Sequence, residues 1–368
     1  MKRFVVVVVA TALIAGCGGH TSEDNPTPVA ASTTPSPTAA AEASSAWWQI
    51  ADLPTARSEA AIALFGDRQI FVIGGVGGPS RVERYDSAAN SWVSAPDLPI
   101  GVVDAMAATM EGLQNNSPQG VFVFGGYLAD GSATARSFRF NYSTARWEEI
   151  APMPAPRAAA AAVAMGGSIF IVGGSGGSGL VAPTYRYDVD TQQWRSVAAI
   201  PTPRDQLAVV GDFKNSLCAI GGRQLSPPIN LATFECYDPV SDVWTRLPDA
   251  PFARSRAAAV QYDGLVYVVG GEQSSGTSRE LAIFDTSTNS WSRGPDLPTA
   301  RQGLGVMVIP WTKDLDVTGK NLVFTPARLL AIAGAPAPGG SPSAVCEAMD
   351  LPFSPPLPPG AQIATPTH

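Results

Sequence analysis

A motif that recurs along most of the chain constrains its fold more than any other feature. Five apolar runs each end in a pair of glycines: FVIGG at Gly75, FVFGG at Gly126, FIVGG at Gly174, CAIGG at Gly222 and YVVGG at Gly271. Successive pairs are 51, 48, 48 and 49 residues apart. A regular period of this length indicates an array of similar units, none of which can bury its apolar face alone.

Two further markers recur in the same order. A tryptophan stands seven positions after an aromatic residue in five places: Tyr85/Trp92, Phe140/Trp147, Tyr187/Trp194, Tyr237/Trp244 and Phe284/Trp291. A short segment ending in proline, such as APDLP or PDAP, follows each tryptophan. The 36 glycines and 33 prolines among 368 residues argue against a helical bundle, because both residues are unfavourable inside helices and common in turns.

This combination resembles the kelch motif over roughly residues 46–353. The resemblance implies an all-β fold in which each repeat is a four-stranded blade and the blades form a ring. Segments such as AAIALFGDRQIFVIGG fit two apolar strands joined by a turn. We therefore interpret the glycines, aromatics and tryptophans as blade framework rather than as a ligand site.

A sixth, incomplete repeat sets the number of blades. LLAIAG at 329–334 and the segment 347–350 match two strands of a blade, but Pro356 stands seven residues after Met349, where a tryptophan is expected. The segment WWQIADLP at 47–54 is an outer strand without preceding strands of its own. We predict a six-bladed kelch-type β-propeller whose last blade is closed by the N-terminal strand.

The N-terminal region predicts export and a lipid anchor. Lys2 and Arg3 precede the apolar run FVVVVVATALIA, which is too short to span a bilayer and suits a signal peptide. LIAGC, ending at Cys17, resembles the bacterial lipobox. The resemblance implies a lipoprotein signal peptide at 1–16 and a diacylglyceryl group on the Cys17 sulfur; the alternative is a plain secretory signal with a chance cysteine.

Residues 18–45 contain 20 Pro, Ala, Ser or Thr residues among 28. Such a composition cannot bury enough apolar surface to order the chain. We predict a flexible tether at 17–45, beginning with the lipidated cysteine, and a Pro-rich irregular tail at 354–368.

Two insertions interrupt the repeat, EGLQNNSPQG from residue 111 and a longer one at 310–327. The second insertion is either a contact site or the result of sequence drift in a degenerate last blade. Asp314, Asp316 and Asn321 within it do not fit the spacing of a calcium-binding EF-hand loop. We therefore expect a solvated loop.

Composition limits the chemistry. A net charge of −7 makes nucleic acid an unfavourable partner. Some kelch propellers are enzymes, among them the copper-dependent galactose oxidase, but the two histidines here are His20, in the tether, and His368, the last residue. We therefore exclude copper oxidase chemistry and a Ser-His-Asp triad, and expect no metal or cofactor. A bacterial sialic-acid mutarotase shares the kelch fold, so epimerisation of a sugar by arginine and carboxylates stays open.

Cys218 and Cys236 fall on the second and third strands of the fourth blade. If Ile220 faces Phe234 in this hairpin, Cys218 faces Cys236. Export to an oxidising compartment would permit a disulfide; the alternative is two small core side chains. Cys346 is expected to be a lone buried thiol.

An arginine recurs three residues after the proline that ends the tryptophan segment: Arg57, Arg157, Arg204, Arg254 and Arg301, with Arg256 nearby as a sixth cation. If these links lie near the central opening, the guanidiniums form a candidate ring that binds carboxylates or sulfates. The alternative is a framework role, with the charges neutralised by Glu59, Asp104 or Asp205.

These observations favour a membrane-anchored, extracytoplasmic kelch module, without catalysis, for an unknown and possibly anionic protein, glycan or cell-wall component. The alternative is a mutarotase-like carbohydrate-active enzyme at the central mouth. Carboxylates converging on an arginine in a pocket would favour the enzyme, and an open mouth of arginines would favour binding.

Overall fold

The structure is a computed structural model that describes residues 46–66, 68–110, 119–213, 215–315, 322–352 and 362–363. Every regular element in these residues is a β-strand, and the described chain holds no helix long and apolar enough to cross a membrane. The predicted signal peptide, Cys17 and the tether lie outside the described residues, as do residues 111–118 of the first insertion and most of the tail.

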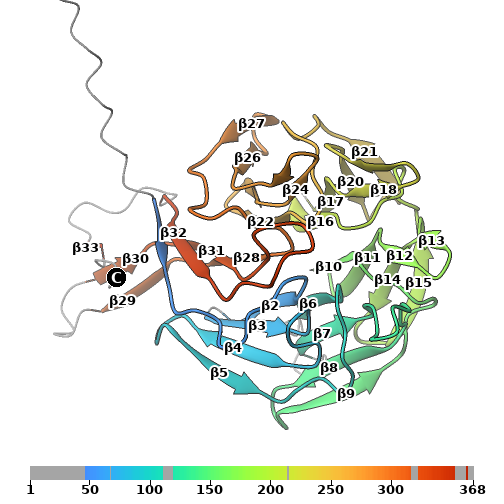
Figure 1. Cartoon of the computed structure of the whole chain (residues 1–368), viewed down its shortest axis with the longest axis horizontal. Helices are drawn as coiled ribbons and strands as arrows, with labels where there is room; N and C mark the ends of the chain where they lie inside the picture. Colours follow the sequence, from blue (N-terminus) through green and yellow to red (C-terminus); the bar gives the residue numbers. More distant parts are fainter. Residues whose placement is uncertain are drawn as a thin grey trace, which may run out of the picture. The chain divides into compact units, whose positions relative to one another are not determined.

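Six four-stranded antiparallel sheets form the blades of a ring (Figure 1). Blade 1 consists of β2 (Ala61–Phe65), β3 (Gln69–Ile73), β4 (Val82–Asp86) and β5 (Ser91–Ala95). Blade 2 consists of β6 (Met106–Met110), β7 (Gly120–Phe124), β8 (Ser137–Asn141) and β9 (Arg146–Ile150). Blade 3 consists of β10 (Ala161–Met165), β11 (Ser168–Val172), β14 (Thr184–Asp188) and β15 (Gln193–Val197).

The other three blades repeat this order from the inner to the outer strand. Blade 4 consists of β16 (Ala208–Phe213), β17 (Ser216–Ile220), β20 (Phe234–Asp238) and β21 (Val243–Arg246). Blade 5 consists of β22 (Ala258–Tyr262), β23 (Leu265–Val269), β26 (Leu281–Asp285) and β27 (Ser290–Arg293). Blade 6 consists of β28 (Gly305–Ile309), β31 (Arg328–Ile332), β32 (Cys346–Asp350) and β1 (Trp47–Gln49). The predicted six-bladed, all-β propeller is confirmed.

The N-terminal strand closes the ring, as predicted. Trp47 pairs with Met349, and Gln49 with Glu347, in an antiparallel register. Tyr85 and Trp92 pair in the same way in blade 1. Trp47 therefore supplies the tryptophan that the sixth repeat lacks in its own sequence.

These tryptophans join each blade to its predecessor. In every blade the indole N–H donates to a main-chain carbonyl that follows the outer strand of the preceding blade, at 2.7 to 3.0 Å. The pairs are Trp92–Ala51, Trp147–Pro96, Trp194–Ala151, Trp244–Ala198, Trp291–Pro248 and Trp47–Pro295. The series of bonds is circular, because Trp92 of blade 1 bonds to Ala51, which follows the outer strand of blade 6.

The core lies between neighbouring blades. Phe170 of blade 3 clusters with Leu217 and Tyr237 of blade 4. A middle strand such as β7 is buried along its whole length, because a blade covers each of its faces, whereas the outer strand β9 is largely exposed. Continuous apolar runs therefore mark the second strand of each repeat.

The glycine pairs end these second strands in left-handed backbone. At Gly74 and Gly75 φ is 63° and 88°, and a Cβ on Gly75 would lie 2.6 Å from the Ser58 carbonyl oxygen. Ala333 adopts a φ of 58° at the first position in blade 6, so that position tolerates a methyl group. The second position stays glycine because main chain passes beside it.

Short hairpins extend three of the loops that follow the glycine pairs. They are β12 (Ser175–Gly176) with β13 (Gly179–Leu180), β18 (Arg223–Leu225) with β19 (Pro228–Asn230), and β24 (Glu272–Gln273) with β25 (Gly276–Thr277). These hairpins lengthen the loops at one end of the propeller.

The insertion at 310–327 differs from the expected loop. It contains β29 (Thr312–Leu315) and β30 (Leu322–Thr325), which pair with each other outside the ring (Figure 1). β33 (Gln362–Ile363) adds a parallel strand to β30, so the tail is not irregular throughout. The free edge of β30 gives this part of the tail a partner that sequence periodicity does not reveal.

Candidate functional site at the mouth of the propeller

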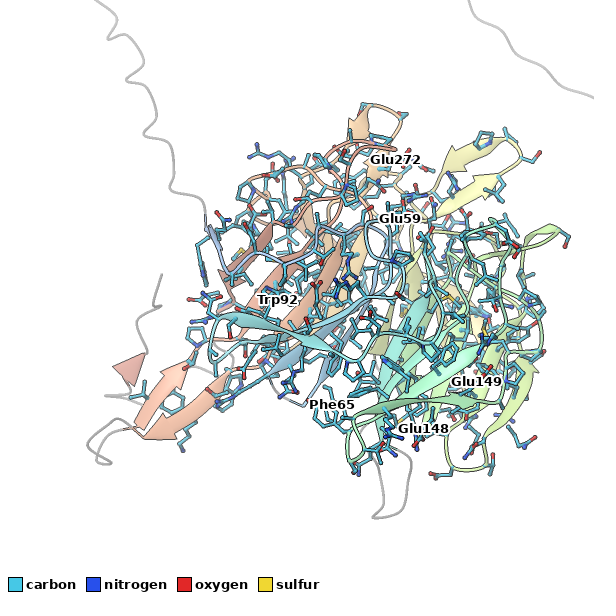
Figure 2. The ribbon with its side chains drawn as sticks, turned by 60° about the horizontal axis from the view of Figure 1, so that its bottom comes forward. Glu59, Phe65, Trp92, Glu148, Glu149 and Glu272 are labelled. Carbon is cyan, nitrogen blue, oxygen red and sulfur yellow. A yellow bond between two sulfur atoms is a disulfide. The ribbon has the colours of Figure 1, made fainter. Side chains whose placement is uncertain are left out.

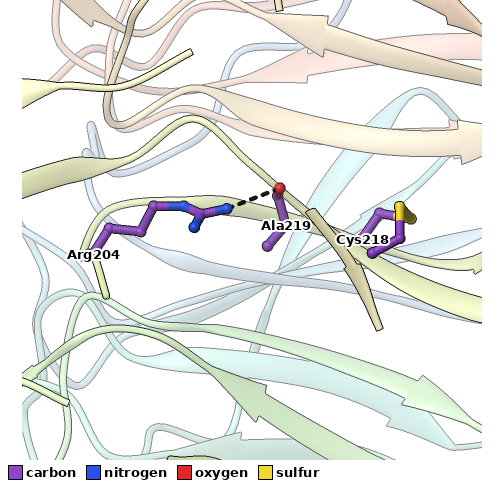
Figure 3. The surroundings of a disulfide bond; sticks show 4 residues. Arg204, Cys218 and Ala219 are labelled. Carbon is purple, nitrogen blue, oxygen red and sulfur yellow. Dashed lines mark hydrogen bonds between the residues drawn. A yellow bond between two sulfur atoms is a disulfide. The ribbon is translucent and has the colours of Figure 1, made fainter. Parts of the chain in front are cut away.

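The five repeat arginines lie inside the blades. Arg57, Arg157, Arg204 and Arg301 have no exposed surface, and Arg254 is 2% exposed. Their guanidiniums donate to main-chain carbonyls at or beside the glycine pairs. Arg204, for example, donates to the Ala219 carbonyl at 3.0 Å (Figure 3). Of the two interpretations that the sequence left open for these five arginines, their burial fits the framework role and does not fit a ring open to a ligand.

Their charges are balanced by acids of the third strands rather than by Glu59, Asp104 or Asp205. Four arginines pair with a glutamate at or near the start of that strand: Arg57 with Glu83, Arg204 with Glu235, Arg254 with Glu280 and Arg301 with Glu347. Arg157 instead lies 4.1 Å from the centre of the Tyr185 ring, and burial lowers its pKa to about 10. Each ion pair connects the link that enters a blade to the third strand of the same blade.

A closed ring of main-chain hydrogen bonds surrounds the propeller axis at this end. One residue per blade link has a φ between 52° and 58°, and its N–H donates to the carbonyl of the equivalent residue in the preceding link at 2.7 to 3.0 Å. We call these six residues the mouth ring: Glu59, Asp104, Ala159, Gln206, Arg256 and Gly303. The ring presents six side-chain positions on a fixed backbone.

The mouth ring lines a cavity of about 160 Å³. Figure 2 shows Glu59 and Glu272 at the end of the propeller where the short hairpins extend, and Phe65 and Glu148 at the opposite end. A second cavity of about 310 Å³ is lined by the inner strands, with side chains such as Ile62, Val163 and Met307. The residues of the mouth ring are therefore mainly polar, whereas the side chains that line the channel are mainly apolar.

Arg256 reaches the mouth, in contrast to the five buried arginines. Its guanidinium contacts the Glu59 carboxylate and lies 3.9 Å from the Glu272 carboxylate. Burial lowers the pKa of Arg256, and the charge of Glu272 opposes that effect. Two carboxylates therefore balance the one mouth arginine.

The Asp104 carboxyl group, in contrast, has no cation in contact with it in the part of the chain that the structure describes. No hydrogen bond to its carboxyl group is found among the described residues, and burial together with the nearby charge of Asp205 raises its pKa to about 7, although Arg223 opposes the shift. Asp205 itself pairs with Arg223 at 3.3 Å. The Asp104 carboxyl therefore combines a pKa raised to about 7 with the absence of a hydrogen-bond donor in contact with it among the described residues.

Sequence analysis did not identify these acids as a site. It treated Glu59 and Asp104 as partners of the repeat arginines, whereas both stand in the mouth ring. The signal available in the sequence was their position. Glu59 stands two residues after Arg57, and Asp104 stands two residues after Val102, which occupies the place of the arginine in the second repeat. Aspartates at the ends of third strands have a framework role: the Asp86 carboxylate, for example, accepts from the Ala88 N–H at 2.9 Å. The described residues contain no group of three or more His, Cys, Asp or Glu placed to hold a metal.

Cys218 and Cys236 face each other in blade 4, which confirms the predicted register. The structure joins them in a disulfide (Figure 3). Cys346 is a free, buried thiol, and burial raises its pKa to about 11. The disulfide lies in the wall between blades and takes no part in the mouth.

Comparison with family models matches the repeats directly. A model described as "KLHDC2/KLHL20/DRC7 Kelch-repeats domain" matches residues 105–250, and one described as "Kelch motif" matches residues 63–99 and 253–298. The chain is a kelch-repeat propeller. The matches include blades 1 to 5 and contain Ala159, Gln206 and Arg256 of the mouth ring.

Known kelch proteins share this propeller at low identity. Kelch-like protein 36 of Mus musculus is 26% identical over 268 residues, covering 71% of this chain and 35% of that protein. Kelch-like protein terF of Aspergillus terreus is 25% identical over 277 residues, covering 68% of this chain and 59% of that protein. The chain thus spans about a third of the length of the mouse protein.

A solved structure supports the fold. The structure of YjhT aligns with a TM-score of 0.65 and 16% identity, covering 81% of this chain and 95% of the other. At this level of identity the likeness shows the fold alone.

Proposed function

We propose that the protein is a membrane-anchored, extracytoplasmic binding module that docks a partner protein on the face around the mouth. The observation that carries the proposal is exposed apolar surface beside the mouth ring. Leu225 and Ile229, on the hairpin β18–β19, are 36% and 48% exposed. Isolated aliphatic side chains on a surface are ordinary, but two on one projecting hairpin are suited to protein contact.

An apolar pocket adds to this face. Pro79, Ile100, Tyr127 and Leu128 line a cavity of about 530 Å³ between the loops of blades 1 and 2. Val103, which also lines it, directly precedes Asp104 of the mouth ring. An apolar pocket next to a charged mouth provides both the area and the polar groups that interfaces combine.

The relatives support an interaction role in general terms, because kelch domains commonly mediate protein–protein contact. Two features support the location. The lipobox-like sequence ending at Cys17 suits lipid anchoring after export, and the Cys218–Cys236 disulfide suits an oxidising compartment. Substitution Cys17→Ala is expected to release the protein from the membrane fraction or leave it uncleaved. Unchanged processing and retention would contradict the anchor.

Crosslinking in the native envelope tests the docking face. Leu225→Lys combined with Ile229→Lys is expected to abolish a crosslinked partner by placing two charges in the interface. Val240→Lys is the matched control, because Val240 is 90% exposed in an outer turn of the same blade. Equal crosslinking by both variants would exclude this face as the docking site.

A second candidate function has one observation in its favour. Glu59 and Glu272 converge on Arg256 within the mouth, which is the arrangement expected of the mutarotase-like enzyme. NMR exchange between sugar anomers tests it directly. Faster exchange with the protein than with its Arg256→Met variant would support the enzyme, and identical rates would reject it.

A further inference from the structure

The charged side chains at the mouth are more often acidic than basic. Four carboxylates line or border the cavity against two guanidiniums: Glu59, Asp104, Asp205 and Glu272 against Arg223 and Arg256. Both guanidiniums already contact carboxylates. Asp104 is the acid that is left without a cation in contact with it.

Gln206 gives a second, independent sign of a missing donor. Its side chain lines the cavity and is 92% buried, from an exposed fraction of 8%. Its Oε1 has no hydrogen-bond partner among the described residues. A buried acceptor without a donor is unfavourable by about 1–3 kcal/mol, so it indicates a ligand that would satisfy it.

A small residue separates these two acceptors along the mouth ring. In the mouth ring Ala159 stands between Asp104 and Gln206, and it contributes only a methyl group. A ligand that donates hydrogen bonds and carries positive charge can enter there without displacing Arg256. An anion at the same place would face the excess of carboxylates.

We propose that the mouth ring binds an alkylammonium group, the end of a lysine side chain of the docked partner, between Asp104 and Gln206. This inference rests on the proposed docking function and adds the chemical group of the partner that the mouth binds. An ammonium group has three N–H donors and no acceptor, which complements a carboxylate and a carbonyl oxygen. The cavity volume of about 160 Å³ accommodates the four-carbon stem of one lysine.

Binding should depend on pH through Asp104. Its carboxyl group faces the charges of Asp205 and Arg223 from blade 4 and has Glu59 as its neighbour in the mouth ring. With a pKa of about 7, most Asp104 carboxyls are ionised at pH 8 and most are protonated at pH 6. Because the ionised form binds the cation, affinity should fall about tenfold from pH 8 to pH 6.

A titration of the full-length protein with n-butylammonium, followed by ligand-observed NMR, tests the proposal; n-butanol and butyrate are the neutral and anionic probes. Asp104→Asn should weaken n-butylammonium binding by about ten- to a hundredfold at pH 8 and remove the pH dependence. Asparagine tolerates the left-handed backbone of this position, so the variant should fold. Gln206→Glu should tighten binding, because it adds a carboxylate of the same shape.

Asp190→Asn is the matched control, since Asp190 is exposed in an outer turn. This variant should bind n-butylammonium with the same affinity as the unaltered protein. The proposal would be overturned if the Asp104→Asn variant bound n-butylammonium as tightly as the unaltered protein does. It would also be overturned if the unaltered protein bound butyrate as tightly as n-butylammonium. If a partner crosslinks to the face but n-butylammonium does not bind, the docking function stands and the ammonium site is rejected.

Discussion

Replacing Arg204 by methionine tests whether the repeat arginines stabilise the fold. The guanidinium is fully buried and donates to the Glu235 carboxylate at 2.5 Å and to the carbonyls of Thr202 and Ala219. Methionine fills much of the space but leaves the buried Glu235 without its cation. Breaking a buried ion pair in this way costs about 3–5 kcal/mol.

For roughly 300 ordered residues this cost corresponds to a fall in melting temperature of about 5–8 °C. Differential scanning calorimetry measures it directly. Arg246→Met is the matched control, because Arg246 pairs with Asp249 on the surface of the same blade, where the melting temperature should hardly change. Adding Glu235→Leu to Arg204→Met should restore part of the loss, because no unpaired charge then remains.

A stabilising role for the buried Arg204–Glu235 pair would be refuted if Arg204→Met and Arg246→Met melted at the same temperature. It would also be refuted if the double variant were less stable than Arg204→Met alone. Either result would mean that the buried pair does not hold the link between blades 3 and 4.

Three further predictions concern other parts of the molecule. Trp47→Phe should lower the melting temperature by a few degrees, because it removes the bond to Pro295 but keeps an aromatic ring, and calorimetry of the variant checks this. Peptide mapping of unreduced protein should recover Cys218 linked to Cys236, and recovery of both as free thiols would contradict the structure. Folding raises the pKa of Asp104 to about 7, so between about pH 4 and pH 7 the folded state binds a proton that the unfolded state does not. The free energy of unfolding therefore falls as pH rises through this range. The melting temperature of the unaltered protein, measured relative to that of Asp104→Asn, should decrease over the same range.

The fold could be predicted from the sequence because each repeat carries its own local signals. The glycine pairs mark left-handed ends of buried strands, and the spacing between aromatic and tryptophan reflects a hairpin register, as in the pairing of Tyr85 with Trp92. Closure was predictable because the sixth repeat lacked the strand that residues 47–54 supplied.

The site was predicted less well. The repeat places an arginine near the mouth in sequence, but only the packing of adjacent links shows that Arg204 points into the blade while Arg256, two residues after Arg254, points into the mouth. Arg256 has left-handed backbone with a φ of 53°, as have the other mouth-ring residues, and its residue type does not indicate this conformation. The partners of the buried arginines, such as Glu235, lie about 30 residues further on and have no local signal.

Closure by β1 has a consequence for how the protein is made. Trp47 is synthesised before the rest of the propeller, but Met349, its partner in β32, follows about 300 residues later. At roughly 5–20 residues per second the ribosome needs about 15–60 s to reach it. During that interval β1 has no strand to pair with and the ring is open on one side. Wherever the chain folds, the native circle can be completed only once β32 is available to β1, in a step that joins the two ends of the propeller.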